Sequence, residues 1–204
     1  MSTSAILLAA GSGSRMGYLP KCLISVNGQI LLRRTLRALS LPQIDEVVLL
    51  TGHHAQLIHP HLAEFTLKLV HNRAPQESLT SSLRLGLAAV TGDTVVVALA
   101  DQPLLSPQDI GDLLLAWQHR PLTQELLYPS VHGSRGNPVV FSRSVVQEVL
   151  ASHDHFGVRQ WQEQHPSKVC VWSSTNTHYT TDLDSPEDLD KLRLLGHELV
   201  LPRL

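Results

Sequence analysis

Runs of apolar residues alternate along the chain with segments in which apolar positions recur every three to four residues. The runs are rich in β-branched residues and are typical of buried strands, whereas the periodic segments are typical of helices with one apolar face. Strands are predicted at residues 4–10, 46–51, 67–70, 94–100, 139–141 and 169–172. Helices are predicted at residues 31–39, 55–64, 79–90, 107–117, 143–151 and 186–195.

This alternation favours an α/β fold in which a mostly parallel central sheet is covered by helices on both faces. In sheets of this kind, ligands bind at the carboxyl ends of the strands. Residues 125–181 have shorter strands and more turns, which indicates a lobe that closes over the same edge. At 204 residues, the chain is predicted to form a single domain.

Composition and charge narrow the choice of function. Hydrophobic residues make up 43% and charged residues 17% of the chain, as in ordinary globular proteins. A net charge of −2 provides no footprint for nucleic acid, and no apolar run approaches the ~18 residues of a membrane span. Residues 1–4 lead into the first strand without the features of a secretory signal, so a cytoplasmic location is predicted. Cys22 and Cys170 have neither disulfide nor zinc spacing.

A glycine-rich segment follows the first strand. Residues 8–17 read LAAGSGSRMG, and Lys21 follows shortly after. Positive φ angles are expected at Gly11 and Gly13, where backbone N–H groups can approach a ligand closely, and Arg15 and Lys21 add positive charge. The loop therefore predicts a polyphosphate site, although its spacing fits neither the dinucleotide fingerprint nor a Walker loop. A glycine turn beside two surface cations is the alternative.

An aspartate follows the strand at 94–100. Burying the carboxylate of Asp101 is costly unless a cation compensates, so a metal ion is a natural partner. A helix cap or turn is the alternative, because Pro103 and Ser106 also mark a helix start.

A second acidic cluster covers residues 182–188. Ser185 and Asp188 have the spacing of a capping box, which leaves Asp182 and Asp184 without a structural explanation. One of these two could complete an oxygen-ligand site for Mg²⁺ with Asp101.

Three further features are open to two interpretations. Residues 72–83 are polar and run into a helix, so they could dock a base or a phosphate, or simply cap the helix through Ser78. Arg135, in the segment RGNPVVF, suits a phosphate of a second substrate but could equally be an exposed hairpin residue. A cluster of histidines could bind a transition metal if His54 and His61 share one helical face, although Pro60 interrupts that helix. The cluster comprises His53, His54, His59 and His61.

Five of these segments, taken in order, resemble the molybdenum cofactor nucleotidyltransferases, which are MobA-like NTP transferases. They are LAAGSGSRMG with Lys21, the segment 72–87 ending in SSLRLGL, the Asp101-Gln102-Pro103 turn, RGNPVVF and DLDSPEDL. The cytidylyltransferase branch is the most similar, because Ala10 stands where the GTP-using branch has glycine. Ser78 stands where relatives usually have glycine.

The resemblance implies a Rossmann-like, three-layer fold of the nucleotide-diphospho-sugar transferase type. It also implies transfer of CMP from CTP to the phosphate of molybdopterin, with Mg²⁺ as cofactor and release of pyrophosphate. A molybdoenzyme would receive the product, and no nucleic acid or membrane would be involved. The nucleotide would bind in residues 1–120 and the acceptor in a lobe at 121–182, and a C-terminal helix and tail would occupy 183–204.

The site residues follow from the same resemblance. Arg15, Lys21 and Asp101 would be catalytic, and Asp101 and Asp184 would hold the metal. The nucleotide would contact Leu8, Ala9, Ala10, Gly11, Ser12, Gly13, Arg15, Lys21, Asn72, Ser78, Ser82 and Asp101, with Ser82 the best candidate for base recognition. The acceptor would contact Arg135, Gly136, Asn137 and Pro138.

Several alternatives remain open at this point. The chain could use GTP as a guanylyltransferase, or transfer CMP to a sugar or polyol phosphate. It could also be a non-catalytic, nucleotide-binding cofactor chaperone. The presence of Arg15, Lys21, Asp101 and Asp184 together favours an enzyme.

Overall fold

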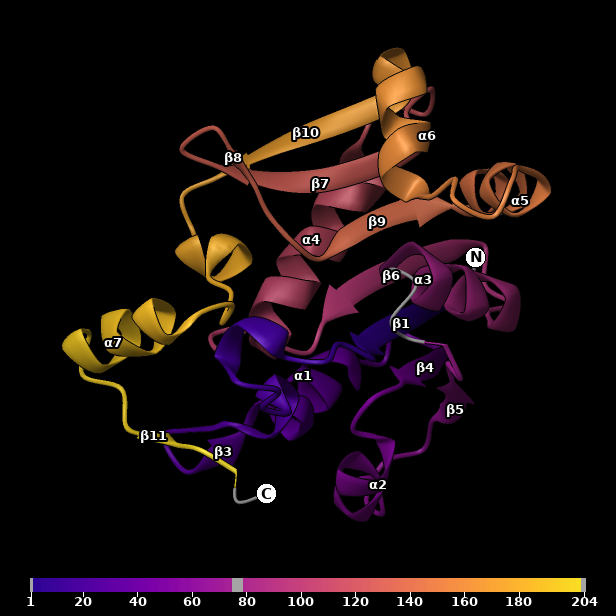
Figure 1. Cartoon of the computed structure of the whole chain (residues 1–204). Helices are drawn as coiled ribbons and strands as arrows, with labels where there is room; N and C mark the ends of the chain where they lie inside the picture. The colour runs from indigo at the N-terminus through magenta and orange to yellow at the C-terminus, as the bar shows by residue number, and fades with distance from the viewer. Residues whose placement is uncertain (1, 75–78, 203–204) are drawn as a thin grey trace.

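An eight-stranded sheet forms the centre of the computed structural model, which describes residues 2–74 and 79–202 (Figure 1). The strand order is β10-β7-β9-β6-β1-β4-β5, and β8 pairs with β7. The strands are β1 (Thr3–Ala9), β4 (Glu46–Thr51), β5 (Lys68–His71), β6 (Thr94–Leu99), β7 (Leu126–Val131), β8 (Ser134–Arg135), β9 (Val139–Ser142) and β10 (Val169–Ser174).

Strands β5, β4, β1 and β6 run parallel, with Ile6 opposite Val48 on one side and Val97 on the other. Strand β9 is antiparallel to both β6 and β7, and β10 is parallel to β7. The predicted mostly parallel sheet is therefore confirmed, and its antiparallel part lies in the predicted acceptor lobe.

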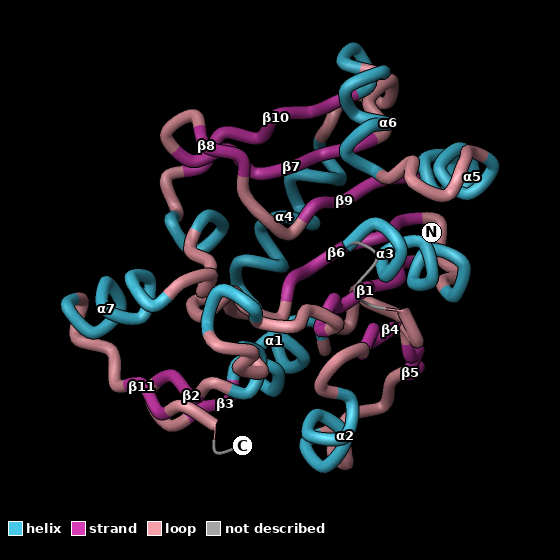
Figure 2. The backbone as a smooth tube through the Cα atoms, in the orientation of Figure 1, coloured by secondary structure: helices cyan, strands magenta, loops and turns pink. Residues whose placement is uncertain are grey.

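Helices cover both faces of the sheet, as Figure 2 also shows. Alternate residues of β1 pack against different layers: Ala5 and Leu7 face the core shared with α1 and α4, whereas Ile6 and Leu8 face the core shared with α3, α5 and α6. Burial on both sides explains the unbroken apolar run of β1. The covering helices are α1 (Leu31–Leu39), α4 (Pro107–His119), α3 (Leu79–Ala89), α5 (Arg143–Ala151) and α6 (Val158–Gln164).

A smaller unit joins the two ends of the chain. Strand β11 (Leu199–Val200) pairs with β2 (Ser25–Val26), which pairs with β3 (Gln29–Ile30). Helix α7 (Pro186–Leu194) lies beside this small sheet, and its Leu189 and Leu192 pack in a third apolar cluster with Met16 (Figure 1). The C-terminal segment is thereby fixed close to the glycine-rich loop.

The predicted helix at 55–64 is wrong in its length. Helix α2 (Ala55–Ile58) is followed by a 3₁₀ turn, His59–His61, because Pro60 cannot donate a backbone hydrogen bond in a continuing α-helix. His54 and His61 therefore do not share one α-helical face.

Two further observations concern the cysteines and the character of the helices. Cys22 is buried and Cys170 half-buried, and both are free thiols. Within the parts of the chain that the structure describes, none of the helices has the length and apolar character needed to cross a bilayer.

Candidate active site

The glycine-rich loop leaves the sheet at the carboxyl end of β1. Gly13 has a φ of 68°, and a Cβ there would lie 2.0 Å from the carbonyl oxygen of Leu19, so only glycine fits. The positive φ expected at Gly11 is absent; positive values occur at Gly13 and Gly17 instead. A Cβ at Gly11 would meet no atom within 4 Å, so space beside the loop is open to a ligand.

Contacts on two sides hold this loop in place. Met16 is buried in the third apolar cluster, and its N–H donates to the carbonyl of Gly13 over 2.8 Å. His54 Nε2 lies 3.0 Å from the carbonyl oxygen of Ser12. The sequence did not predict this contact, because His54 follows β4 rather than β1. The loop is therefore fixed before a ligand arrives.

Lys21 joins two carboxylates from distant parts of the chain. Its Nζ lies 2.8 Å from Asp101 Oδ2 and 2.7 Å from Asp184 Oδ1, across sequence separations of 80 and 163 residues. Arg15 Nη1 lies 3.4 Å from Asp184 Oδ2. The structure thus brings together the four charged residues that the sequence assigned to one site.

The electrostatics of this cluster favour charged side chains. Burial opposes the charge of Lys21, but the charges of Asp101 and Asp184 and the hydrogen bonds to them outweigh it and raise the pKa of Lys21. Asp101 Oδ1 is buried and accepts no hydrogen bond within the described residues. This oxygen can therefore still receive a cation or a donor.

Asp101 is not the cap of the following helix. Ser106 is the N-cap of α4, and Asp109 completes its capping box. The cap alternative for Asp101 is therefore wrong, although Asp101 does lie in a turn. The capping box predicted for Ser185 and Asp188 at α7 is confirmed.

Asp182 adds a third carboxylate near the first two. Burial, together with the charges of Asp101 and Asp184, raises its pKa to about 7. The intervening Leu183 is buried, and its N–H donates to the carbonyl of Asp101 over 2.9 Å. This bond fixes the segment before α7 against the Asp101 turn.

These carboxylates fit a divalent cation that also binds a substrate. Carboxylate oxygens are ligands that Mg²⁺ prefers, and Asp101 offers a buried oxygen without a partner. Among the described residues, no three His, Cys, Asp or Glu side chains are grouped as a protein-only metal site. A cation held by Asp101 and Asp184 would therefore complete its coordination with phosphate oxygens and water, as Mg²⁺ commonly does.

A small cavity lies between the glycine-rich loop, Lys21 and the Asp101 turn. Its volume is about 50 Å³, room for one or two water molecules at roughly 30 Å³ each. Burial raises the pKa of the Cys22 thiol in its wall to about 12, so this thiol stays protonated. The lining residues are Leu8, Ala9, Gly11, Pro20, Lys21, Cys22, His54, Ala100 and Asp101.

A larger hollow of about 730 Å³ shares His54 with this cavity. His53, His59 and His71 also line it, which places most of the histidine cluster next to the glycine-rich loop. The sequence did not predict this position.

The residues predicted to recognise the base are buried. Ala10, Asn72 and Ser82 are at most 4% exposed, and Asn72 Nδ2 donates to Ser82 Oγ over 2.9 Å. The carboxamide oxygen of Asn72 also accepts from the N–H of Ala74, which fixes the turn after β5. Ser78 lies outside the described residues. Base recognition by this segment stays a prediction.

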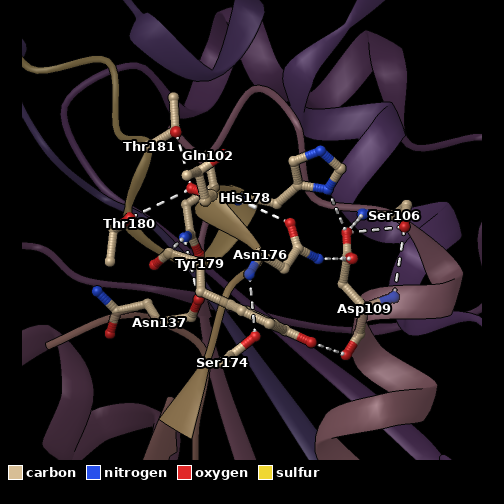
Figure 3. A network of polar contacts seen from close by, with 11 residues as sticks. Gln102, Ser106, Asp109, Asn137, Ser174, Asn176, His178, Tyr179, Thr180 and Thr181 are labelled. Carbon is tan, nitrogen blue, oxygen red and sulfur yellow. Dashed lines mark hydrogen bonds and ion pairs between the residues drawn. The ribbon is translucent and has the colours of Figure 1, made fainter. Parts of the chain in front are cut away.

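The predicted acceptor turn is tied to the Asp101 turn by Gln102. This buried side chain donates from Nε2 to the carbonyls of Asn137, at 3.1 Å, and Tyr179, at 3.3 Å (Figure 3). Gly136 fits tightly beside Tyr179, because a Cβ would lie 2.6 Å from the Tyr179 carbonyl oxygen. Pro138, which follows Asn137, is buried, whereas Arg135 is exposed. Sequence reasoning gave Gln102 no role.

Asp109 fixes the segment that leads to the acidic cluster. Its buried carboxylate accepts from Asn176 Nδ2 over 2.6 Å and lies 3.0 Å from His178 Nδ1 (Figure 3). Tyr179 Oη donates to the Asp109 carbonyl over 2.8 Å. Helix α4 is therefore the support on which residues 176–184 rest.

Comparison with known families agrees with this geometry. A family model described as "MobA-like NTP transferase domain" matches residues 5–169. The chain belongs to this family. The match includes the glycine-rich loop, the Asp101 turn and the predicted acceptor turn, and it confirms the nucleotidyltransferase family expected from the sequence.

Individual relatives have varied names. Nicotine blue oxidoreductase from Paenarthrobacter nicotinovorans is 29% identical over 92% of this chain and 94% of its own length. Among solved structures, Rv0371c from Mycobacterium tuberculosis H37Rv superposes with a TM-score of 0.80, at 24% identity, over 94% of this chain and 97% of that chain. Rv0371c has also been solved in complex with manganese.

A CMP:2-keto-3-deoxy-manno-octonic acid synthetase complexed with CTP superposes with a TM-score of 0.70, at 18% identity, over 96% of this chain and 98% of that chain. These likenesses confirm the predicted nucleotide-diphospho-sugar transferase type of fold.

Proposed function

We propose that this protein transfers CMP from CTP to the phosphate of a molybdopterin-type cofactor and releases pyrophosphate, with Mg²⁺ as its cofactor. The observation that carries the proposal is the convergence of Asp101 and Asp184 on Lys21 beside the glycine-rich loop. Ala10 supports CTP over GTP. The CTP-bound synthetase and the manganese-bound Rv0371c, which share this fold, are consistent with a cytidylyl donor and a divalent cation.

The glycine-rich loop binds the triphosphate in this proposal. Backbone N–H groups of Gly11, Ser12 and Gly13 would donate to the phosphate oxygens, with open space for the ligand beside Gly11, and Arg15 and Lys21 would neutralise the phosphate charge. Because the Arg15 side chain is 72% exposed and, among the described residues, pairs only with Asp184, its guanidinium can turn toward a phosphate at little cost.

Positioning and charge stabilisation supply most of the catalysis. A phosphate oxygen of the acceptor attacks the α-phosphorus in line, and pyrophosphate leaves from the opposite side. Lys21 stabilises negative charge that accumulates on the phosphoryl oxygens. No general base is required, since the attacking phosphate is already ionised. A divalent cation held by Asp101 and Asp184 would neutralise further charge on the phosphate oxygens.

The lobe at residues 121–182 holds the acceptor in this scheme. Arg135, Gly136, Asn137 and Pro138 form its contact turn, and Gln102 connects that turn to the reacting centre. Residues 1–120 bind the nucleotide, and residues 183–204 supply Asp184 and the helix that supports it. A molybdoenzyme that receives the product and a cytoplasmic location stay predictions from the sequence.

One experiment separates the proposal from its alternatives. The purified protein is incubated with Mg²⁺ and each of the four nucleoside triphosphates, with and without molybdopterin, and pyrophosphate is followed. Release that needs both CTP and molybdopterin is expected. Release with GTP would assign the guanylyl reaction, and release with CTP only after addition of a sugar or polyol phosphate would assign another acceptor. Nucleotide binding without turnover would contradict an enzymatic role.

A further inference from the structure

One carbonyl of the glycine-rich loop depends on a single side chain. The Gly13 carbonyl accepts two backbone hydrogen bonds, from the N–H groups of Met16 at 2.8 Å and Tyr18 at 3.0 Å. The preceding carbonyl, that of Ser12, has His54 Nε2 at 3.0 Å as its only partner among the described residues. Because a carbonyl oxygen can only accept, Nε2 carries a hydrogen. The backbone therefore fixes the Gly13 carbonyl, whereas His54 fixes the Ser12 carbonyl.

The sheet holds His54 beside the loop. Strands β1 and β4 are parallel neighbours with Ala9 opposite Thr51, so the segments that follow them leave the sheet at the same edge. His54 is the N-cap residue of α2, and its carbonyl accepts from the N–H of Ile58 over 3.1 Å. Ile58 is fully buried in the core. The imidazole donor is thereby held at a fixed place, where it also lines the small cavity of the candidate site.

The orientation of the Ser12–Gly13 peptide decides what the loop presents to a ligand. In a planar trans peptide, the carbonyl of one residue and the N–H of the next point in opposite directions. With the Ser12 carbonyl held at His54, the Gly13 N–H points away from the imidazole. Within the part of the chain that the structure describes, neither this N–H nor those of Gly11 and Ser12 donate a hydrogen bond. These groups are therefore available to an anion.

Glycine allows this peptide to turn over. Gly13 has a φ of 68°, and glycine adopts negative φ values about as readily, so rotation of the preceding peptide plane costs little in the backbone. A peptide turned in this way would point the Ser12 carbonyl where the Gly13 N–H now points. A carbonyl oxygen repels a phosphate oxygen, whereas an N–H binds it. The hydrogen bond from His54 opposes this rotation.

We propose that His54 is a positioning residue that locks the Ser12–Gly13 peptide with its N–H directed toward a bound polyphosphate. The assignment of the loop as the polyphosphate site rests on the proposed function, whereas the orientation of the peptide does not. His54 acts on the ligand through the Ser12 carbonyl and requires no contact with the ligand itself.

Inorganic tripolyphosphate tests the lock without a base or an acceptor, and isothermal titration calorimetry measures its affinity. His54→Phe keeps a ring but has no donor, so it should weaken binding about tenfold through loss of one hydrogen bond to a charged group. His54→Gln carries an amide N–H that can replace Nε2–H, and it should bind within about twofold of the unchanged protein. His119→Phe is the matched control and should have no effect, because His119 is an exposed histidine of α4 whose Nδ1 also lies beside a main-chain carbonyl, that of Leu115, at 2.8 Å.

Two NMR measurements on the ¹⁵N-labelled protein report on the peptide itself. The Gly13 amide resonance should shift when tripolyphosphate is added to the unchanged protein and to His54→Gln, but not when it is added to His54→Phe. A long-range ¹H–¹⁵N spectrum of the unchanged protein at alkaline pH should place the imidazole hydrogen of His54 on Nε2. A general loss of stability would produce neither pattern.

The lock is contradicted if His54→Phe binds tripolyphosphate as tightly as the unchanged protein, or if His54→Gln binds it as weakly as His54→Phe. It is also contradicted if the imidazole hydrogen lies on Nδ1, or if the Gly13 resonance of the unchanged protein does not respond to tripolyphosphate. These last two results need no variant. In turnover assays, His54→Phe should raise KM for the nucleotide about tenfold and leave KM for the acceptor unchanged. If no acceptor supports pyrophosphate release, the proposed function fails, but the tripolyphosphate measurements still decide whether His54 orients the loop.

Discussion

The proposed nucleotide-binding part and the proposed acceptor lobe are built in different ways. In the former, functional residues come directly after buried parallel strands: Gly11 follows β1 and Asp101 follows β6. In the latter, the contact turn and the segment 176–184 are held by buried side chains that bind backbone carbonyls and amide groups across the lobe. Gly11 and Asp101 are thus fixed by the sheet, whereas the proposed acceptor surface is fixed by hydrogen bonds that single substitutions can remove.

This difference predicts separate consequences for mutation. Changes at the sheet edge should abolish chemistry and leave folding intact, because the charged side chains are only partly buried and contribute little packing. Changes to the polar network should affect stability and activity together, because the same bonds position the acceptor turn and hold the lobe.

The largest effect is expected for Asp101→Ala. Loss of this carboxylate removes the buried oxygen that fits a cation and one of the two partners of Lys21. Pyrophosphate release should become undetectable, while the circular dichroism spectrum and the melting temperature stay close to those of the unchanged protein. Asp190→Ala on the exposed face of α7 is the control, and it should retain full activity. Unchanged turnover in Asp101→Ala would contradict the assignment of Asp101 as a metal ligand. It would also contradict the expectation that changes at the sheet edge abolish the reaction.

Lys21→Ala comes next in size. The side chain would stabilise charge that develops as pyrophosphate leaves, so its loss should lower kcat about 100-fold and change KM for the nucleotide little. Steady-state kinetics of pyrophosphate release measure this, with Lys191→Ala, an exposed lysine of α7, as the control. An increase in KM with unchanged kcat would mean that Lys21 binds the ground state and the transition state equally and does not stabilise the developing charge.

The same contrast explains what the sequence could predict about the fold. Strands β1, β4 and β6 were predictable because sheet residues that are buried on both faces form continuous apolar runs. Strand β7 was not predicted, because Pro129 interrupts its pattern with a residue that has no backbone N–H to donate to a sheet. Helix α2 is the opposite case. The apolar period of residues 55–64 was given more weight than Pro60, and the predicted helix was therefore too long.

The candidate active site was also only partly predictable from the sequence. The proximity of Arg15, Lys21, Asp101 and Asp184 could be expected from a resemblance carried by five ordered segments. Gln102, Asp109 and Tyr179 could not, because the partners named for them above lie 35 to 77 residues away and such contacts leave no periodicity or spacing in the sequence. The position of the histidines beside the loop depends on where β4 and β5 end, which only the folded sheet establishes.

Gln102→Met tests the network with a side chain of similar length. The Asn137 carbonyl would lose its Gln102 donor, so the free energy of unfolding should fall by about 2 kcal/mol. Displacement of the acceptor turn should also lower kcat/KM for the acceptor about tenfold. Denaturant unfolding and acceptor kinetics measure the two effects. Gln108→Met is the control, since Gln108 is exposed and donates to the exposed side of α4, at Asp112 Oδ1. An equal loss in both variants would contradict the role of Gln102 in holding the turn.

Asp182→Asn is expected to have the smallest effect, and its sign depends on pH. Burial and two neighbouring carboxylates raise the pKa of Asp182 in the folded protein to about 7 from an ordinary value of 3.8. The folded protein therefore holds this proton more tightly than the unfolded chain does, and the resulting stability, present at acid pH, is lost as the pH rises toward 7.

Asparagine cannot lose a proton, so this loss is absent from the Asp182→Asn variant. With a chelator present, the variant and the unchanged protein should have similar free energies of unfolding at pH 4, and the variant should be more stable at pH 8 by at least about 1 kcal/mol. Urea unfolding at both pH values measures the difference, with Asp190→Asn as an exposed control that should show none. A difference that is the same at pH 4 and pH 8 would mean that folding does not raise the pKa of Asp182, and it would contradict the electrostatic coupling of Asp182 to Asp101 and Asp184.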